Sequence, residues 1–194
     1  MNKLVGVTIL SMLFFSCGRP KYNEPHVLIK TKLGDIELEL FPKKAPKTVA
    51  AFLSYIDSGL YKNTSFYRVL KAEEMPTDNN SGIIQAGIYG SASNKVGKIG
   101  PIPHESTRQT GLSHTSGTIS FASLGAGTAT TEFFICIGDQ SPFDAGRHGT
   151  TDDKGFAAFG KVFMGMDIVR KIQSQSSEGD QFDKKINIIN IKRW

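Results

Sequence analysis

Arg68 is the residue of this sequence whose type and position most directly suggest chemistry. It lies in residues 65–70, Ser-Phe-Tyr-Arg-Val-Leu, where polar residues alternate with aromatic and aliphatic ones, and this alternation predicts a strand. An arginine on the face of a sheet presents a rigid fork of hydrogen-bond donors. Such a fork can hold a substrate by its backbone, or stabilise a transition state that needs a hydrogen bond. Taken alone, Arg68 also fits a solvated strand residue, because most charged side chains are exposed.

Other residue types that carry chemistry do not combine into a familiar site. The four histidines have no ligand-like spacing, so no metal site is expected. Ser120 and Ser123 follow His114, which could indicate a hydrolase, but neither serine lies in a nucleophile elbow. Residues 125–128 match only part of a dinucleotide fingerprint, so no cofactor is expected. Cys136 lies in a fully apolar run and is predicted to be a buried thiol, not a nucleophile.

The elements that must position Arg68 are mostly strands. Apolar patterns predict strands over residues 27–30, 35–40, 65–70, 83–88, 117–123, 132–138, 157–163 and 186–192. Two helices are expected: Pro46 begins one that ends at Gly59, and residues 166–173 form the other. Mostly antiparallel strands with only two helices indicate an all-β fold, a closed eight-stranded barrel with a helix over each end.

The composition fits one globular domain, which we place at residues 27–194. The chain has 194 residues, of which 39% are hydrophobic and 21% charged, enough to build one core. The formal net charge of +5 gives a weak general attraction to anionic surfaces. No basic run is dense enough to indicate nucleic acid as a partner, and the domain is expected to be a monomer.

The N-terminal residues predict an export signal followed by a tether. Residues 4–15 form an apolar run after Lys3 that is too short to span a membrane. Cys17 follows the small residue Ser16, and this segment resembles the lipobox of bacterial lipoproteins. The resemblance implies a signal peptide over residues 1–16, acyl chains on Cys17 and a lipidated tether over residues 17–26. The protein would then lie in the cell envelope, anchored to a membrane and facing the periplasm. A plain cleaved signal or an uncleaved anchor stays open.

Five segments in order carry a second resemblance. They are residues 65–70, residues 82–87 (Gly-Ile-Ile-Gln-Ala-Gly), residues 117–122 with 132–136 (Gly-Thr-Ile-Ser-Phe-Ala and Glu-Phe-Phe-Ile-Cys), and residues 159–162 (Phe-Gly-Lys-Val). Together they resemble the motifs of cyclophilin-type peptidyl-prolyl isomerases, from about Val27 to the C-terminus. That family implies the same barrel, no cofactor, and Xaa-Pro bonds of polypeptides as the substrate.

The resemblance also implies roles for individual residues. Arg68 is the catalytic donor, aimed at the proline nitrogen, which gains a lone pair as the amide twists. The implied substrate-binding residues are Gln85, Ile83, Ala122, Ser123, Glu132, Phe134, Phe143 and Phe156. Because slow proline isomerisation can limit folding, the expected clients are exported proteins.

The chain also departs from the family pattern around the expected groove. Glu132 replaces a glutamine and would put a carboxylate beside Arg68. Tyr67 replaces a histidine next to the arginine. Gly82, Ser123, Pro142 and Phe156 stand where the family has phenylalanine, asparagine, tryptophan and histidine.

These changes keep a second function open, a proline-peptide binding chaperone with little or no turnover. A barrel that carries a small apolar ligand is a third class, disfavoured because bulky residues should fill a small barrel. The long segments 71–82 and 139–155 are expected to flank the groove.

Overall fold

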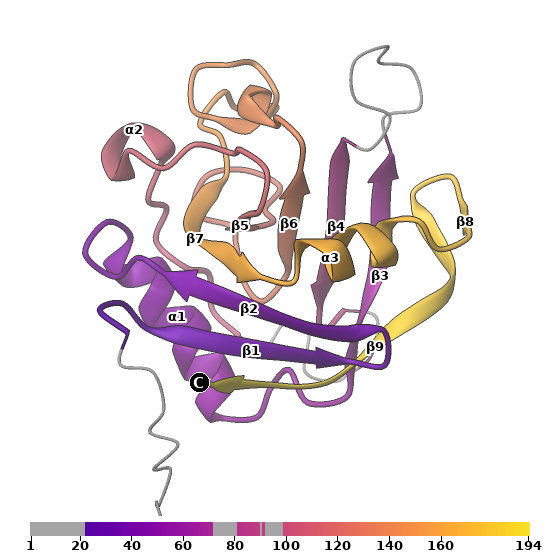
Figure 1. The fold of residues 1–194 in the computed structure, drawn as a ribbon. Helices are drawn as coiled ribbons and strands as arrows, with labels where there is room; N and C mark the ends of the chain where they lie inside the picture. The colour runs from indigo at the N-terminus through magenta and orange to yellow at the C-terminus, as the bar shows by residue number, and fades with distance from the viewer. Residues whose placement is uncertain (1–21, 72–80, 90, 92–98) are drawn as a thin grey trace, which may run out of the picture.

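The chain folds into a closed antiparallel barrel (Figure 1). A computed structural model describes residues 22–71, 81–89, 91 and 99–194. The strands are β1 (His26–Thr31), β2 (Gly34–Leu40), β3 (Thr64–Lys71), β4 (Gly82–Gly87), β5 (Thr118–Phe121), β6 (Phe133–Ile137), β7 (Ala157–Met164), β8 (Ser177–Glu178) and β9 (Gln181–Arg193). Their order is β1-β2-β7-β5-β6-β4-β3-β9, and the pairing of β1 with β9 closes the ring. The predicted eight-stranded barrel is confirmed, and β8 adds only a short hairpin to β9.

Two helices lie at opposite ends of the barrel, as expected (Figure 1). Helix α1 (Pro46–Asp57) has proline in its first turn, where the missing N–H costs little. Helix α3 (Met166–Gln173) packs Ile168 over Gly34, where an added Cβ would lie only 2.4 Å from the isoleucine. The sequence did not predict α2 (Thr107–Thr110) or the 3-10 turn η1 (Ser141–Phe143), since each is too short for a periodic pattern.

Side chains fill the interior of the barrel. Phe52 of α1 packs against four aromatic rings, with ring centroids 5.0–6.0 Å from its own. One ring comes from the turn between α1 and β3 and three from strands: Tyr61, Phe121, Phe133 and Phe159. All five rings are 1% exposed or less. Removing one such ring from a core costs about 3–5 kcal/mol, so this cluster is a main source of stability. A filled interior also agrees with the argument against a small-ligand carrier.

The predicted signal peptide and Cys17 lie outside the described residues. The last part of the predicted tether is described, and there the Tyr22 ring stacks on His26 of β1 with centroids 3.6 Å apart. Across the described ranges, no helix has the length and apolar character needed to cross a membrane.

Candidate active site

One groove on the barrel collects every residue that was predicted to act on substrate. Its volume is about 720 Å³, and it opens over β3, β4, β6 and the segment after β5. Arg68, Ile83, Gln85, Ala122, Ser123, Glu132, Phe134, Phe143 and Phe156 all line it. The structure therefore brings nine positions, drawn from six separate segments, to one place.

The apolar half of the groove is a pocket built around Phe134. The Phe134 side chain is almost fully buried, at 2% exposure. The rings of Phe143 and Phe156 meet it edge-on, with centroids 5.8 and 5.2 Å away. Ile83 and Cys136 pack behind these rings in a cluster separate from the barrel core. The pocket offers aromatic faces and edges on several sides, which suits a small apolar ring.

The polar half of the groove is built around Arg68, which is held by one partner on β4 and one in the turn before β9. Its Nε donates to Asp180 Oδ2 at 2.7 Å, and its Nη1 donates to Gln85 Oε1 at 3.1 Å. Its side chain is 35% exposed. The hydrogen bond from Arg68 holds the pKa of the Asp180 carboxyl below its ordinary value. These bonds use two of the five N–H donors of the guanidinium and fix its plane.

A line of hydrogen bonds continues from Arg68 to Glu132. Gln85 Nε2 donates to the Tyr67 hydroxyl at 2.8 Å, and that hydroxyl donates to Glu132 Oε2 at 2.7 Å. Burial and the nearby Glu132 charge raise the pKa of Tyr67, so its hydroxyl stays protonated and can donate. The Glu132 carboxylate can only accept, so the Tyr67 hydroxyl must donate to it. That hydroxyl then accepts from the Gln85 amide nitrogen. The Gln85 amide is thereby oriented with its oxygen toward Arg68.

Backbone groups anchor the Glu132 end of this line. Its Oε1 accepts hydrogen bonds from the amides of Ile88 and Tyr89 at 2.8 and 3.1 Å, and from the Thr131 hydroxyl at 3.0 Å. Gly87 lies against the same carboxylate, and an added Cβ would come within 2.2 Å of it. The position therefore has room only for glycine while Glu132 keeps this rotamer.

Comparison with known proteins decides the family. A model described as cyclophilin type peptidyl-prolyl cis-trans isomerase/CLD matches residues 26–193. The chain belongs to this family. It is 35% identical over 173 residues to peptidyl-prolyl cis-trans isomerase A of Dickeya dadantii, covering 89% of this chain and 83% of that protein.

Solved structures agree with this assignment. A cyclophilin type peptidyl-prolyl cis-trans isomerase of Cryptosporidium parvum is similar with a TM-score of 0.69 and 25% identity, over 88% of this chain and 98% of that one. A second structure of the same protein, in the presence of the dipeptide Ala-Pro, gives a TM-score of 0.67 and 25% identity, over 87% and 98%.

One expectation about the cyclophilin groove is wrong. Glu132 was expected to put its carboxylate beside Arg68, but it reaches Arg68 only through Tyr67 and Gln85. The carboxylate that pairs with Arg68 is Asp180, just before β9. Sequence reasoning missed Asp180 because only the pairing of β3 with β9 brings it near, and no local pattern marks it.

A second missed residue is Leu70, which supplies apolar surface at the edge where Gly82 has no side chain. Gly82 cannot carry one, since its Cβ would lie 1.9 Å from the Leu70 carbonyl oxygen. Leu70 packs against the Phe134 pocket and lines the groove. A signal for it was present, because Leu70 is two residues after Arg68 and so shares its face of the strand.

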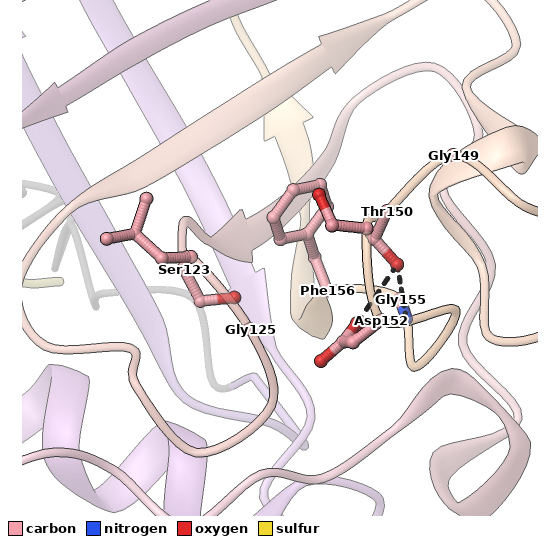
Figure 2. Close-up of a pocket in the computed structure, with 9 residues that line it drawn as sticks. Ser123, Gly125, Gly149, Thr150, Asp152, Gly155 and Phe156 are labelled. Carbon is pink, nitrogen blue, oxygen red and sulfur yellow. Dashed lines mark hydrogen bonds between the residues drawn. The ribbon is translucent and has the colours of Figure 1, made fainter.

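The segment 139–155 flanks the groove, as expected. A smaller pocket of about 190 Å³ extends the groove between this segment and residues 123–125, with Phe156 at its side (Figure 2). Asp152 Oδ2 accepts a hydrogen bond from the Ala126 amide at 2.6 Å and so links the two segments. Pro142, in the place of the family's tryptophan, bonds through its carbonyl to the Gly149 amide at 2.9 Å. In the other long segment, residues 72–80 lie outside the described residues.

A buried polar cluster lies beneath the Phe134 pocket. His114 Nδ1 lies 2.6 Å from Asp144 Oδ1, and its Nε2 lies 3.1 Å from Ser120 Oγ. This arrangement resembles a hydrolase triad, but His114 and Ser120 are both 0% exposed, so no substrate can reach the hydroxyl. The His114 ring stacks on Phe134 at 5.9 Å, so the cluster supports the pocket. Cys136 is also 0% exposed, which confirms the predicted buried thiol.

We expect His114 to make stability depend on pH. Burial lowers the pKa of His114, and the hydrogen bond that its Nδ1 donates to the Asp144 carboxylate opposes this only in part. The folded protein therefore takes up this proton at a lower pH than the unfolded chain, whose histidine titrates near about 6.5. The His114 contribution is fully present above about pH 6.5 and is lost as pH falls below it. Thermal unfolding measured between pH 8 and pH 5 tests this. As pH is lowered over this range, Tm should fall less for His114→Gln than for the wild type. Parallel curves would contradict this assignment.

We expect Tyr67→Phe to impair isomerase activity without unfolding the protein. The change removes only the hydroxyl that joins Gln85 to Glu132, and one such hydrogen bond is worth about 0.5–1.5 kcal/mol, or roughly 2–10-fold in kcat/KM. Tyr89→Phe is the matched control, because Tyr89 lines the same groove but is 67% exposed. If the two variants lose the same activity, the Tyr67 hydroxyl does not orient Gln85.

Proposed function

We propose that this cyclophilin-type peptidyl-prolyl cis-trans isomerase acts on Xaa-Pro bonds of exported proteins while a lipid on Cys17 holds it to a membrane. The observation that carries the substrate assignment is the position of the Arg68–Gln85 pair at the edge of the Phe134 pocket. A donor fork beside an apolar pocket fits a peptide bond that precedes a proline ring. The relative solved in the presence of Ala-Pro supports the same class of ligand.

The proposed mechanism needs no covalent bond to break. The barrier to rotation, about 18–20 kcal/mol, is the loss of amide resonance. With the proline ring held against Phe134, the bond twists and the proline nitrogen gains a lone pair. An N–H of Arg68 donates to that lone pair, which is absent in the planar ground state, so the bond favours the transition state. One donor of this kind contributes about 2.7–4 kcal/mol.

The groove wall at Ala122 would bind the peptide backbone. The Ala122 amide already donates to the Glu132 carbonyl at 2.8 Å, so a peptide would bind through the Ala122 carbonyl instead. Contacts of this kind position the substrate without changing during the twist. They set KM more than kcat.

A protease-coupled assay on an Ala-Pro peptide tests the proposed activity. Turnover above the uncatalysed rate supports the isomerase. The rival is a proline-peptide binding chaperone, favoured by the absence of a tryptophan at the rim, where Pro142 stands. A protein that binds the peptide in calorimetry but does not speed isomerisation would establish the rival.

Cys17→Ser is expected to release the protein from the membrane fraction. The proposed acyl chains attach through the Cys17 thiol, and stable anchoring depends on such chains. Fractionation of cells that express the wild type and the variant, with a high-salt wash of the membranes, measures the effect. A matched control is Cys136→Ser, since Cys136 is buried and cannot be acylated in the folded protein. If Cys17→Ser remains in the washed membranes, the anchor is not at this residue.

A further inference from the structure

An aromatic patch lies where the tether meets the barrel. Tyr22 stacks on His26, and Phe163 of β7 packs edge-on against both, with centroids 5.7 Å from Tyr22 and 4.8 Å from His26. Trp194 joins this group because its amide donates to the His26 carbonyl at 3.0 Å. We call Tyr22, Phe163, Met164, Lys192 and Trp194 the tether patch.

The tether patch exposes three large apolar side chains to solvent. Phe163 is 51% exposed, Met164 61% and Trp194 51%. Lys192 lies with its Nζ 5.7 Å from the centre of the Trp194 ring. Aromatic side chains mixed with lysine are typical of the zone where a membrane meets water, because the rings lie at the level of the lipid headgroups.

The tether patch and the catalytic groove lie on opposite sides of the barrel. In the closed ring, β1 and β6 are separated by three strands in either direction. The patch gathers around His26 of β1, which Phe163 reaches from β7, whereas Phe134 of β6 lies at the centre of the groove. A flat partner that covers the patch would therefore leave the groove open.

The length of the tether limits how far this patch can lie from an anchor at Cys17. Tyr22 lies five positions after Cys17, and an extended chain spans at most about 3.6 Å per position, or roughly 18 Å in all. Acyl chains on Cys17 would thus hold the patch within reach of the headgroups. A short tether also gives an effective concentration of about millimolar, so even a weak contact would be occupied.

We propose that the tether patch docks on the lipid bilayer surface, with Phe163, Met164 and Trp194 at the level of the headgroups. In the cell, this docking depends on the proposed lipid anchor at Cys17. Docking gives the barrel one orientation on the membrane, with the groove facing away from the lipid. An anchored barrel without this contact would rotate freely about its tether.

Trp194 reports the contact directly, because it is the only tryptophan of the chain. The experiment reconstitutes the protein purified from membranes into vesicles of phosphatidylethanolamine and phosphatidylglycerol at a 3:1 ratio. We expect the Trp194 emission to shift to shorter wavelength relative to the Cys17→Ser protein in solution, and lipids brominated on their acyl chains to quench it at least twofold. Emission that is unchanged and unquenched in the anchored protein would overturn the proposal.

Two variants make the test specific to the patch. Phe163→Ser with Met164→Ser should reduce the quenching, since it removes two of the exposed apolar side chains of the patch. Leu124→Ser is the matched control, as Leu124 is 98% exposed but lies on the groove side, and it should leave the quenching unchanged. Equal effects of both changes would contradict docking through this face.

An artificial anchor separates failure of docking from failure of the proposed lipidation. Replacing residues 1–17 by a hexahistidine segment keeps all described residues and allows capture on vesicles that contain a nickel-chelating lipid. Quenching of Trp194 in this protein supports docking even if Cys17 carries no acyl chain. A shift that needs no vesicles and grows with protein concentration would assign the patch to a second copy of the chain and overturn the proposal.

Discussion

Arg68→Ala is expected to lower kcat/KM by about 10²- to 10³-fold, the largest effect on turnover of any single change proposed. The size follows from the loss of one preorganised donor, about 2.7–4 kcal/mol. The loss should fall mainly on kcat, since the bond to the proline nitrogen forms only as the amide twists. The assay is the protease-coupled reaction on an Ala-Pro peptide.

The fold should survive this change, because Arg68 lies at the surface of the groove with its side chain 35% exposed. Arg193→Ala is the matched control, since Arg193 also forms an exposed ion pair, with Asp57 at 2.8 Å, but far from the groove. Arg68→Lys tests the geometry of the fork, because it keeps the charge and should still lose most of the activity. Near wild-type turnover in Arg68→Ala, with normal circular dichroism, would remove Arg68 from the mechanism.

Phe134→Ala is expected to combine a loss of activity with a loss of stability. The ring is 2% exposed and packs against Phe143, Phe156 and the buried His114, so its removal opens a cavity that costs about 3–5 kcal/mol of unfolding free energy. The proline ring would lose the same surface, and we expect kcat/KM to fall at least tenfold. Denaturant unfolding and the peptide assay measure the two effects.

Phe66→Ala separates the two consequences. Phe66 is 0% exposed and lies in the barrel core, outside the groove. Its ring centroid is 6.2 Å from that of Phe133. Phe66→Ala should lose similar stability while the folded fraction keeps its kcat/KM. A loss of activity in proportion to stability in both variants would mean that Phe134 is only a core residue.

The barrel was predictable from the sequence because most of its strands carry regular patterns. Ile36, Leu38 and Leu40 alternate inward along β2, as expected. The last strand was predicted over residues 186–192 but begins at Gln181. Its first half escaped prediction because the register with β3 shifts between Phe66 and Arg68, and such an irregularity breaks the alternation of apolar and polar residues.

The groove residues were predictable only through the family resemblance, and the contacts among them were not. Spacing places Arg68 and Gln85 on strands, but it does not show that a tyrosine at position 67 extends its hydroxyl between Gln85 and Glu132. The partner of Arg68 was also hidden, because Asp180 lies 112 positions away in the chain. Side-chain reach and strand register decide these contacts, and neither can be inferred from a local sequence pattern.

The pairing of β1 with β9 sets a condition on how this protein is made. Its register joins Val27 to Arg193, so the first and last strands close the barrel together. During synthesis one edge of β1 and one edge of β3 therefore stay unpaired until β9 has left the ribosome, and unpaired edges favour aggregation. Contacts between such distant parts of a chain also form slowly. An isomerase of this family can thus close its own barrel only after β9, about 150 residues beyond β1, has been made.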